Sequence, residues 1–219
     1  MASLSGGLAD RLAEVRARIT SAGGDLDRTT IVAVTKGVPE SACAAAVDAG
    51  LVDLGENYAQ GLVAKAGALA GGVRWHFLGV VQRNKVRRLA GHVHLWQGVD
   101  SEAAGRSIAG HAPGAQVLVE VNLSGAPQRG GCSWEEAPPL VDALAALGLH
   151  VNGVMGVGDP DDPRPGFRRL ARLAGSLGLP MVSMGMSADL EIAVEEGSTM
   201  VRVGTALFGP RPVHGDLRR

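Results

Sequence analysis

Short apolar runs alternate with helix-like patterns along nearly the whole of this chain, and this alternation constrains its fold more than any other feature. A short run of consecutive apolar residues is typical of a buried strand, whereas apolar residues three to four positions apart indicate a helix. Each run except the last is followed by a plausible helix. The eight expected strands cover residues 31–36, 51–54, 74–79, 93–99, 116–123, 150–156, 180–184 and 199–203.

Repeated strand–helix units predict a parallel sheet, because a crossover must return the chain before the next parallel strand can begin. Eight units in 219 residues favour a (β/α)8 barrel of the TIM type. An open doubly wound sheet is the alternative, since a strand count from one sequence is easily wrong by one or two. An extra N-terminal helix is expected from the helical spacing of its apolar residues, which are Leu8, Leu12, Val15 and Ile19.

The chain is expected to form a single domain over residues 1–219, because no linker or change in composition divides it. Two segments are expected to be loose, namely 158–166, which is rich in Gly, Pro and Asp, and the tail after about residue 210. Helices are expected between the strands, among them 57–70, 101–110, 134–147, 166–177 and 188–196.

Charge and cysteine content exclude several classes of function. Lys plus Arg number 21 and Asp plus Glu number 22, so the net charge of −1 gives no electrostatic basis for binding nucleic acid or an anionic membrane. Cys43 and Cys132 are too few for a disulfide framework. The first 19 residues place charges among apolar residues, which is typical of neither a signal peptide nor a membrane span. We therefore expect a cytoplasmic protein.

Polar residues stand where several of the expected strands end, which is the face of a barrel that carries function. They are Lys36, GENY at 55–58, His76, QRNK at 82–85, Asn122, SMGMS at 183–187 and RVGT at 202–205.

Lys36 is the first candidate, because it occupies the last position of a strand that is otherwise apolar. One interpretation is that its stem packs against the strand while its ammonium group reaches water. The other is an amine held in a partly apolar barrel mouth, where burial disfavours the charged form and leaves a nucleophile for a carbonyl group. In that case Lys36 forms a Schiff base.

Ser187, Gly204 and Thr205 are candidates for a phosphate site. Ser187 precedes the helical stretch 188–196 and is expected to cap it, and a helix N-terminus with a nearby hydroxyl group is also suited to phosphate. Gly204 and Thr205 follow the last strand, where barrels recurrently bind phosphate. Arg202 lies within an apolar strand and faces either a bound ligand or a buried carboxylate, Glu56 or Glu120.

His92 and His94 lie on one face of an expected strand, as metal ligands do, but no third ligand is near them in sequence. We expect no metal. Cys43 lies on an alanine-rich helix and is expected in the core.

Five motifs together resemble the pyridoxal phosphate homeostasis proteins, single-domain relatives of the alanine racemase N-terminal barrel. The similarity extends in order from the first helix to about Arg211. Two departures from the family pattern, Gly37 directly after the lysine and VVQRNK, change neither the lysine nor the phosphate residues. The motifs are VAVTKGVP, DLGENYAQ, WHFLGVVQRNKVR, VNLSG with RGG, and SMGMSADLEIAVEEGSTMVRVGTALFG.

The resemblance implies a fold-type III barrel that binds pyridoxal 5'-phosphate. It implies that Lys36 is the Schiff-base lysine and that Ser187, Gly204 and Thr205 hold the phosphate. It further implies that Arg202 faces the pyridine nitrogen, where a cation disfavours protonation, and that Asn57 lies near the ring substituents.

Two classes of function follow from the resemblance. The favoured one is a protein of pyridoxal phosphate homeostasis, a monomer that holds the cofactor and passes it on, for example to pyridoxal phosphate-dependent apoenzymes. The alternative is an amino-acid racemase or related enzyme. Alanine racemases have a further β domain and a tyrosine base, whereas the only tyrosine here is Tyr58, so a two-base reaction lacks one obvious base. A third possibility is a barrel enzyme that uses a Lys36 imine without any cofactor.

Overall fold

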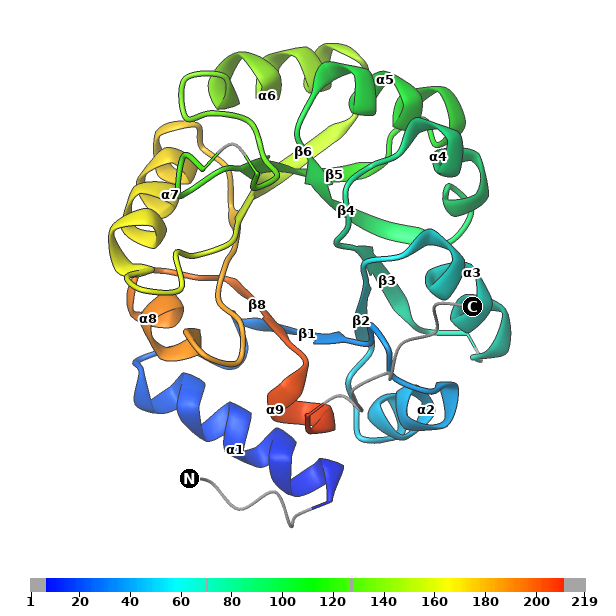
Figure 1. The fold of residues 1–219 in the computed structure, drawn as a ribbon, viewed down its shortest axis with the longest axis vertical. Coiled ribbons are helices and arrows are strands. Elements are labelled where there is room, and N and C mark those ends of the chain that lie inside the picture. The colour runs from blue at the N-terminus through cyan, green and yellow to red at the C-terminus, as the bar shows by residue number, and fades with distance from the viewer. Residues whose placement is uncertain (1–6, 70, 127, 211–219) are drawn as a thin grey trace.

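Eight parallel strands close into a ring at the centre of the computed structural model, which describes residues 7–69, 71–126 and 128–210 (Figure 1). The ring closes because β1 pairs with β8, from Thr30 opposite Met200 to Ala33 opposite Val203. The (β/α)8 barrel is thereby confirmed, and the open doubly wound sheet is excluded. The strands are β1 Thr30–Val34, β2 Asp53–Glu56, β3 Arg74–Phe77, β4 Val93–Val99, β5 Gln116–Val121, β6 His150–Gly156, β7 Met181–Ser183 and β8 Met200–Val203.

Helices surround the ring and cover its outer face (Figure 1). The helix expected at the N-terminus is present and packs against the last two helices of the described residues, burying Leu12, Val15 and Ile19. The helices are α1 Leu8–Ser21, α2 Glu40–Asp48, α3 Ala59–Ala68, α4 Arg83–Leu89, α5 Glu102–His111, α6 Ala137–Ala146, α7 Arg164–Ser176, α8 Leu190–Glu195 and α9 Thr205–Phe208.

The structure differs from the expected elements in two places, and one further expectation is not tested. A short helix, α9, follows the last strand, where no helix was expected. The segment 158–166 is not loose throughout, because α7 begins at Arg164, next to two prolines that favour the start of a helix. The tail expected to be loose after about residue 210 lies outside the described residues.

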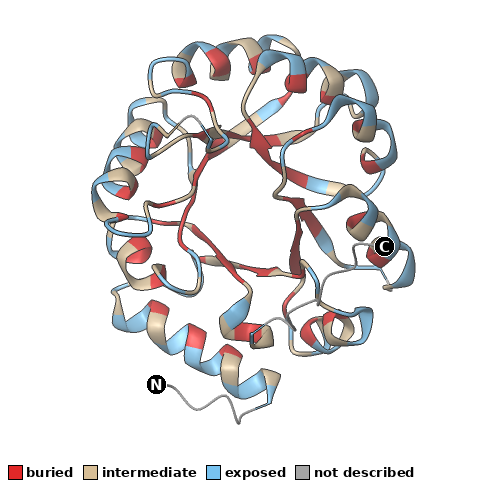
Figure 2. Ribbon diagram, in the orientation of Figure 1, coloured by how far each residue is buried: buried red, intermediate tan, exposed pale blue. Residues whose placement is uncertain are grey.

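Buried residues concentrate on the strands and on the helix faces that meet them (Figure 2). The larger core lies between the ring and the helices, and Cys43 is fully buried in it, as expected. A smaller apolar cluster includes Val32, Leu95, Leu118, Met155 and Met200. Polar side chains are buried in the ring as well, among them His76, Gln97, Ser183 and Arg202.

Within residues 7–69, 71–126 and 128–210, every helix is too short or too polar to cross a bilayer.

Candidate cofactor site at the mouth of the barrel

A hollow of about 520 Å³ opens at the carboxyl end of the barrel, where the loops after the strands meet. All six residues predicted from the sequence line it. They reach it from the ends of four strands: Lys36 from beyond β1, Asn57 from beyond β2, Ser187 from beyond β7, and Arg202, Gly204 and Thr205 from β8 and its loop.

Lys36 lies in a turn two residues past the end of β1, not on the strand itself as expected. Strand pairing ends at Val34. The next residue, Thr35, still donates its backbone N–H to Gly55 and accepts one from Val38, which closes the turn. Gly37 has a φ of 70°, a conformation that suits glycine. This half-buried turn brings the amine of Lys36 over the ring of Tyr58, with 5.2 Å between Nζ and the ring centroid.

Arg202 is buried, and its guanidinium group is held by two neutral acceptors. Nη1 donates to the hydroxyl group of Ser183 at 2.8 Å, and Nη2 donates to the backbone oxygen of Gly156 at 2.9 Å. Burial lowers the pKa of Arg202 to about 10, so the side chain is still a cation at neutral pH. It therefore presents a fixed positive charge to the hollow that it lines.

No ion pair joins Arg202 to Glu56 or Glu120 among the described residues, although the sequence left such a pair open as one alternative. Glu56 is instead bound by Lys65, whose Nζ lies 2.6 Å from Oε2 and also donates to the carbonyl group of Thr35. Lys65 lies in the last turn of α3, and the side chains of Lys65 and Glu56 are both buried. Lys65 therefore links the turn that carries Lys36 to the carboxylate at the end of β2.

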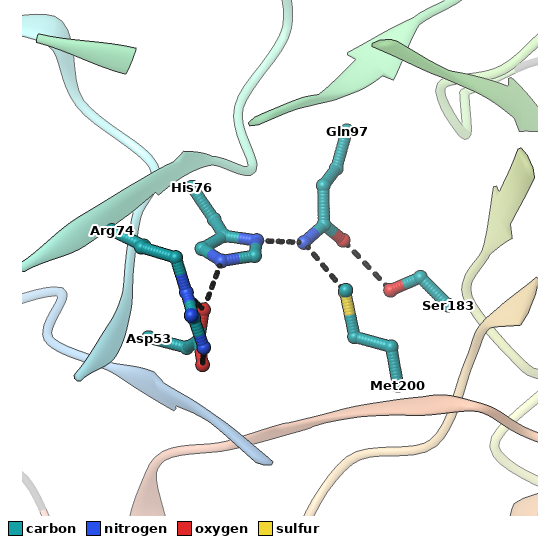
Figure 3. A network of polar contacts seen from close by, with 6 residues as sticks. All are labelled: Asp53, Arg74, His76, Gln97, Ser183 and Met200. Atoms are coloured by element: carbon teal, nitrogen blue, oxygen red, sulfur yellow. Dashed lines mark hydrogen bonds and ion pairs between the residues drawn. The ribbon is translucent and has the colours of Figure 1, made fainter. Parts of the chain in front are cut away.

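The hydroxyl group of Ser183 begins a hydrogen-bond chain that crosses the barrel interior (Figure 3). Because Arg202 can only donate, Ser183 accepts from it and donates its own hydrogen to Gln97 Oε1 at 2.7 Å. The amide nitrogen of Gln97 then donates to His76 Nδ1 at 2.8 Å and to the sulfur of Met200 at 3.1 Å. Because the sulfur of Met200 can only accept, this orientation of the amide directs its N–H groups to acceptors, with His76 Nδ1 as the unprotonated ring nitrogen.

The chain continues to the opposite end of the barrel. Since His76 Nδ1 accepts, its Nε2–H donates to Asp53, at 3.0 Å from Oδ1. Arg74 grips the same carboxylate with two nitrogens, at 2.7 and 2.5 Å. Burial raises the pKa of Asp53, but hydrogen bonds from Arg74 and His76 outweigh it and bring that pKa to about 2. An ionised carboxylate therefore anchors the chain that orients Arg202.

Ser187 does not cap the helix that follows it, contrary to expectation. The residues 187–189 form a turn, Asp189 binds back to the backbone N–H of Met186, and α8 begins only at Leu190. The hydroxyl group of Ser187 instead accepts the backbone N–H of Ala206 at 3.1 Å. Ser187 thus joins the loop after β7 to α9, the short helix that begins with Thr205, and brings two hydroxyl groups to the hollow.

The position of Asn57 depends on backbone segments that pass very close to one another at the barrel mouth. A Cβ atom on Gly79 would lie 2.1 Å from the backbone oxygen of Asn57, and one on Gly98 would lie 2.5 Å from the oxygen of Gly79. Only glycine fits at these two positions, so the loops after β2 and β3 lie directly against each other. Asn57 is half-buried at the edge of the hollow.

Glu120 also lines the hollow, although sequence reasoning considered it only as a partner for Arg202. Burial raises the pKa of Glu120 to about 7, and the nearby Asp100 carboxylate adds to the rise while Arg202 opposes it. The site therefore contains a carboxyl group that titrates near neutral pH.

We expect Glu120→Gln to change how the stability of the cofactor-free protein depends on pH. The folded-state pKa of about 7 lies above the ordinary value of 4.5 for a glutamate, so the folded protein binds this proton more tightly than the unfolded chain does. The contribution of Glu120 is most favourable below pH 4.5 and declines as pH rises to about 7, by roughly 2–3 kcal/mol. Urea denaturation at pH 5 and pH 8 should show that decline in the parent and not in the variant. The exposed Glu14→Gln serves as control, and parallel curves for parent and Glu120→Gln would contradict the expectation.

Two other residues predicted at the mouth, His76 and Asn122, do not line the hollow. His76 belongs to the buried chain, and the side chain of Asn122 organises its own loop through the carbonyl oxygen of Ala126 and the N–H of Gly125. Gln97 was missed as a site residue, and Ser183 was named only as part of SMGMS and not as a partner of Arg202. The available signal was their polarity within strands that are otherwise apolar, VHLWQGV and MVS.

Around His92 and His94, as elsewhere in the described residues, no three His, Cys, Asp or Glu side chains form a metal site.

Comparison with known proteins identifies the family. The model of the alanine racemase N-terminal domain matches residues 9–212. A pyridoxal phosphate homeostasis protein of Pseudomonas aeruginosa is 39% identical, over 93% of this chain and 96% of that protein. The chain belongs to the pyridoxal phosphate homeostasis protein family.

Solved structures agree with this family and with its barrel. PipY of Synechococcus elongatus, solved without and with PLP, superposes with a TM-score of 0.82 in both states at 29% and 28% identity, over 92% of this chain and all of PipY. Alanine racemase of Clostridium difficile shares the fold with a TM-score of 0.71 at 16% identity, over 94% of this chain and 58% of the racemase. The homeostasis family thus keeps the barrel that larger racemases also contain.

Proposed function

We propose that this chain binds pyridoxal 5'-phosphate in the hollow at the barrel mouth and acts in the homeostasis of that cofactor, holding it and passing it on to apoenzymes. The observation that carries the proposal is that Lys36, Arg202 and the Ser187–Thr205 hydroxyl groups line one hollow. The names of the 39% identical relative and of PLP-bound PipY support the same ligand. The cytoplasmic location and monomeric state expected from the sequence are part of the proposal.

The residues present fit this cofactor. When bound, pyridoxal phosphate supplies an aldehyde that condenses with amines and a pyridine ring that draws electrons from them. Lys36 offers the amine for a Schiff base, and Ser187, Gly204 and Thr205 offer hydroxyl and backbone groups to the phosphate. Asn57, at the edge of the hollow, is proposed to lie beside the pyridine ring. Two cations and two hydroxyl groups suit a dianionic ligand, and burial raises the pKa of the one carboxyl group among them, Glu120, to about 7, which disfavours its charged form.

Arg202 favours storage of the cofactor over catalysis. Its charge is retained at neutral pH and its direction is fixed by Ser183 and Gly156, so it opposes a proton on the ring nitrogen that it is proposed to face. An unprotonated ring accepts less electron density from a substrate carbanion. Racemisation also needs proton transfer on two faces, and the single tyrosine, Tyr58, lies against Lys36 itself.

We therefore expect the protein to bind pyridoxal phosphate without racemising alanine at an enzyme-like rate. The test is incubation of L-alanine with stoichiometric cofactor-loaded protein, followed by chiral chromatography, with an authentic alanine racemase as positive control. Formation of D-alanine should be far slower than about 1 per second, the lower end of the usual enzyme range. Turnover at or above that rate would make the chain a racemase, which is the alternative function.

A further inference from the structure

A second hollow of about 550 Å³ lies beside the proposed cofactor site, and Lys36 lines both. It extends from the mouth of the barrel toward α4. Four residues are common to the two hollows, namely Lys36, Asn57, Gly79 and Val80, and the second is completed by Tyr58, Ala59, Gln60, Phe77, Gln82, Lys85 and Arg88.

The second hollow is positively charged. Lys36, Lys85 and Arg88 line it, and none of its lining residues is an aspartate or a glutamate. Lys85 and Arg88 stand three residues apart on α4, so both point to the same side of that helix. Neither side chain forms a hydrogen bond or an ion pair with any described residue. Two neighbouring like charges repel each other and are not compensated within the described part of the protein.

Several other cations of this chain have carboxylate partners, although Arg83 and Arg87, at exposed positions of α4, have none among the described residues. Arg18 binds Glu191, Arg164 and Arg168 share Glu196, and Arg74 binds Asp53. Lys85 and Arg88 differ from Arg83 and Arg87 because they line a hollow together with the amine of Lys36. Two cations at that place indicate a site for an anionic group of a ligand.

We propose that this second hollow receives a free α-amino acid, with its carboxylate on Lys85 and Arg88 and its amine directed to Lys36. The inference rests on the proposed function. The incoming amine forms a carbon–nitrogen bond to the cofactor's aldehyde carbon as the bond to Lys36 Nζ breaks. The two protons lost by the incoming amine pass to Nζ, so the exchange needs no oxidant or reductant. The result detaches the cofactor from the chain, which makes the second hollow the place where release begins.

The test compares L-alanine with L-alaninamide, which carries the same amine but no carboxylate. For each, the concentration that half-converts the absorbance band of the Lys36-bound cofactor is measured in the parent protein and in two double variants. Lys85→Gln/Arg88→Gln removes the two cations that line the hollow. Arg83→Gln/Arg87→Gln is the matched control, because it removes the same charge from the same helix at exposed positions outside the hollow.

The expected result is a loss of preference for alanine over alaninamide in Lys85→Gln/Arg88→Gln by about four- to twentyfold, since each partly exposed charge contact contributes a factor of about two to five. The control variant should keep the parental ratio between the half-converting concentrations of alanine and alaninamide. The two probes differ in amine reactivity, but that difference is the same in every variant and cancels when the ratios are compared. An unchanged ratio in the first variant, or an equal loss in the control, would overturn the proposal. A parent protein that shows no cofactor band before any amine is added would overturn the proposed function as well.

Discussion

Replacing Lys36 with alanine is expected to abolish covalent attachment of pyridoxal phosphate while leaving the barrel intact. Lys36 lies in a half-buried turn beyond β1, where its truncation removes a contact with Tyr58 but opens no core cavity. The chain has three lysines, and Lys65 is held in a buried ion pair with Glu56. Borohydride reduction followed by peptide mass spectrometry should therefore place the pyridoxyl group on Lys36 alone.

Two further variants make this measurement decisive. Lys36→Arg keeps the positive charge but has no primary amine, so it should also lose the reduced adduct. Lys85→Arg keeps the charge of the neighbouring hollow and should retain a full adduct on Lys36. A pyridoxyl group found on Lys65 or Lys85 of the parent protein would refute the assignment of Lys36.

Pyridoxal without its phosphate is expected to bind at least a hundredfold more weakly than pyridoxal phosphate. The hydroxyl groups of Ser187 and Thr205 and the backbone near Gly204 are proposed to hold the phosphate. Each charge-assisted hydrogen bond contributes roughly 1.5–3 kcal/mol, so losing two or three of them gives a difference of that size or more. Spectral titration of the cofactor-free protein with both ligands measures it directly.

Thr205→Val tests the residues behind this difference, because it removes one hydroxyl group while keeping the shape of the side chain. We expect it to weaken binding of pyridoxal phosphate and to leave pyridoxal nearly unaffected. Thr20→Val, at an exposed position of α1, is the control. Equal affinities of the parent protein for the two ligands would show that the phosphate is not bound at this loop.

The order and type of the main elements could be predicted from the sequence because local patterns determine them. Strands buried on both faces give apolar runs, and these runs lie within a few residues of β1 to β8. Closure of the ring was harder to predict, since it depends on pairing between Thr30 and Met200 near the two ends of the chain. No local pattern distinguishes that pairing from an open edge, so the doubly wound sheet remained an alternative.

The candidate site, like the fold, could be predicted only in part from the sequence. Lys36 and Arg202 were identifiable because a charge at the end of, or within, an apolar strand is unusual, and the barrel then brings them to one hollow. The hydrogen-bond and ion-pair partners within the site were not identifiable from the sequence. The hydroxyl group of Ser187 accepts the N–H of Ala206, and Glu56 pairs with Lys65 rather than with Arg202. Such choices depend on side-chain geometry in three dimensions rather than on spacing along the chain.

The polar chain from Arg202 through Ser183, Gln97 and His76 to Asp53 also restricts how this protein can vary. Each member satisfies its neighbours, so replacing one leaves a buried donor or acceptor unpaired at a cost of about 1–3 kcal/mol. A second replacement that removes the orphaned partner recovers part of that loss, so the effects of the two are not additive. Accepted substitutions at these positions are accordingly expected in compensating sets.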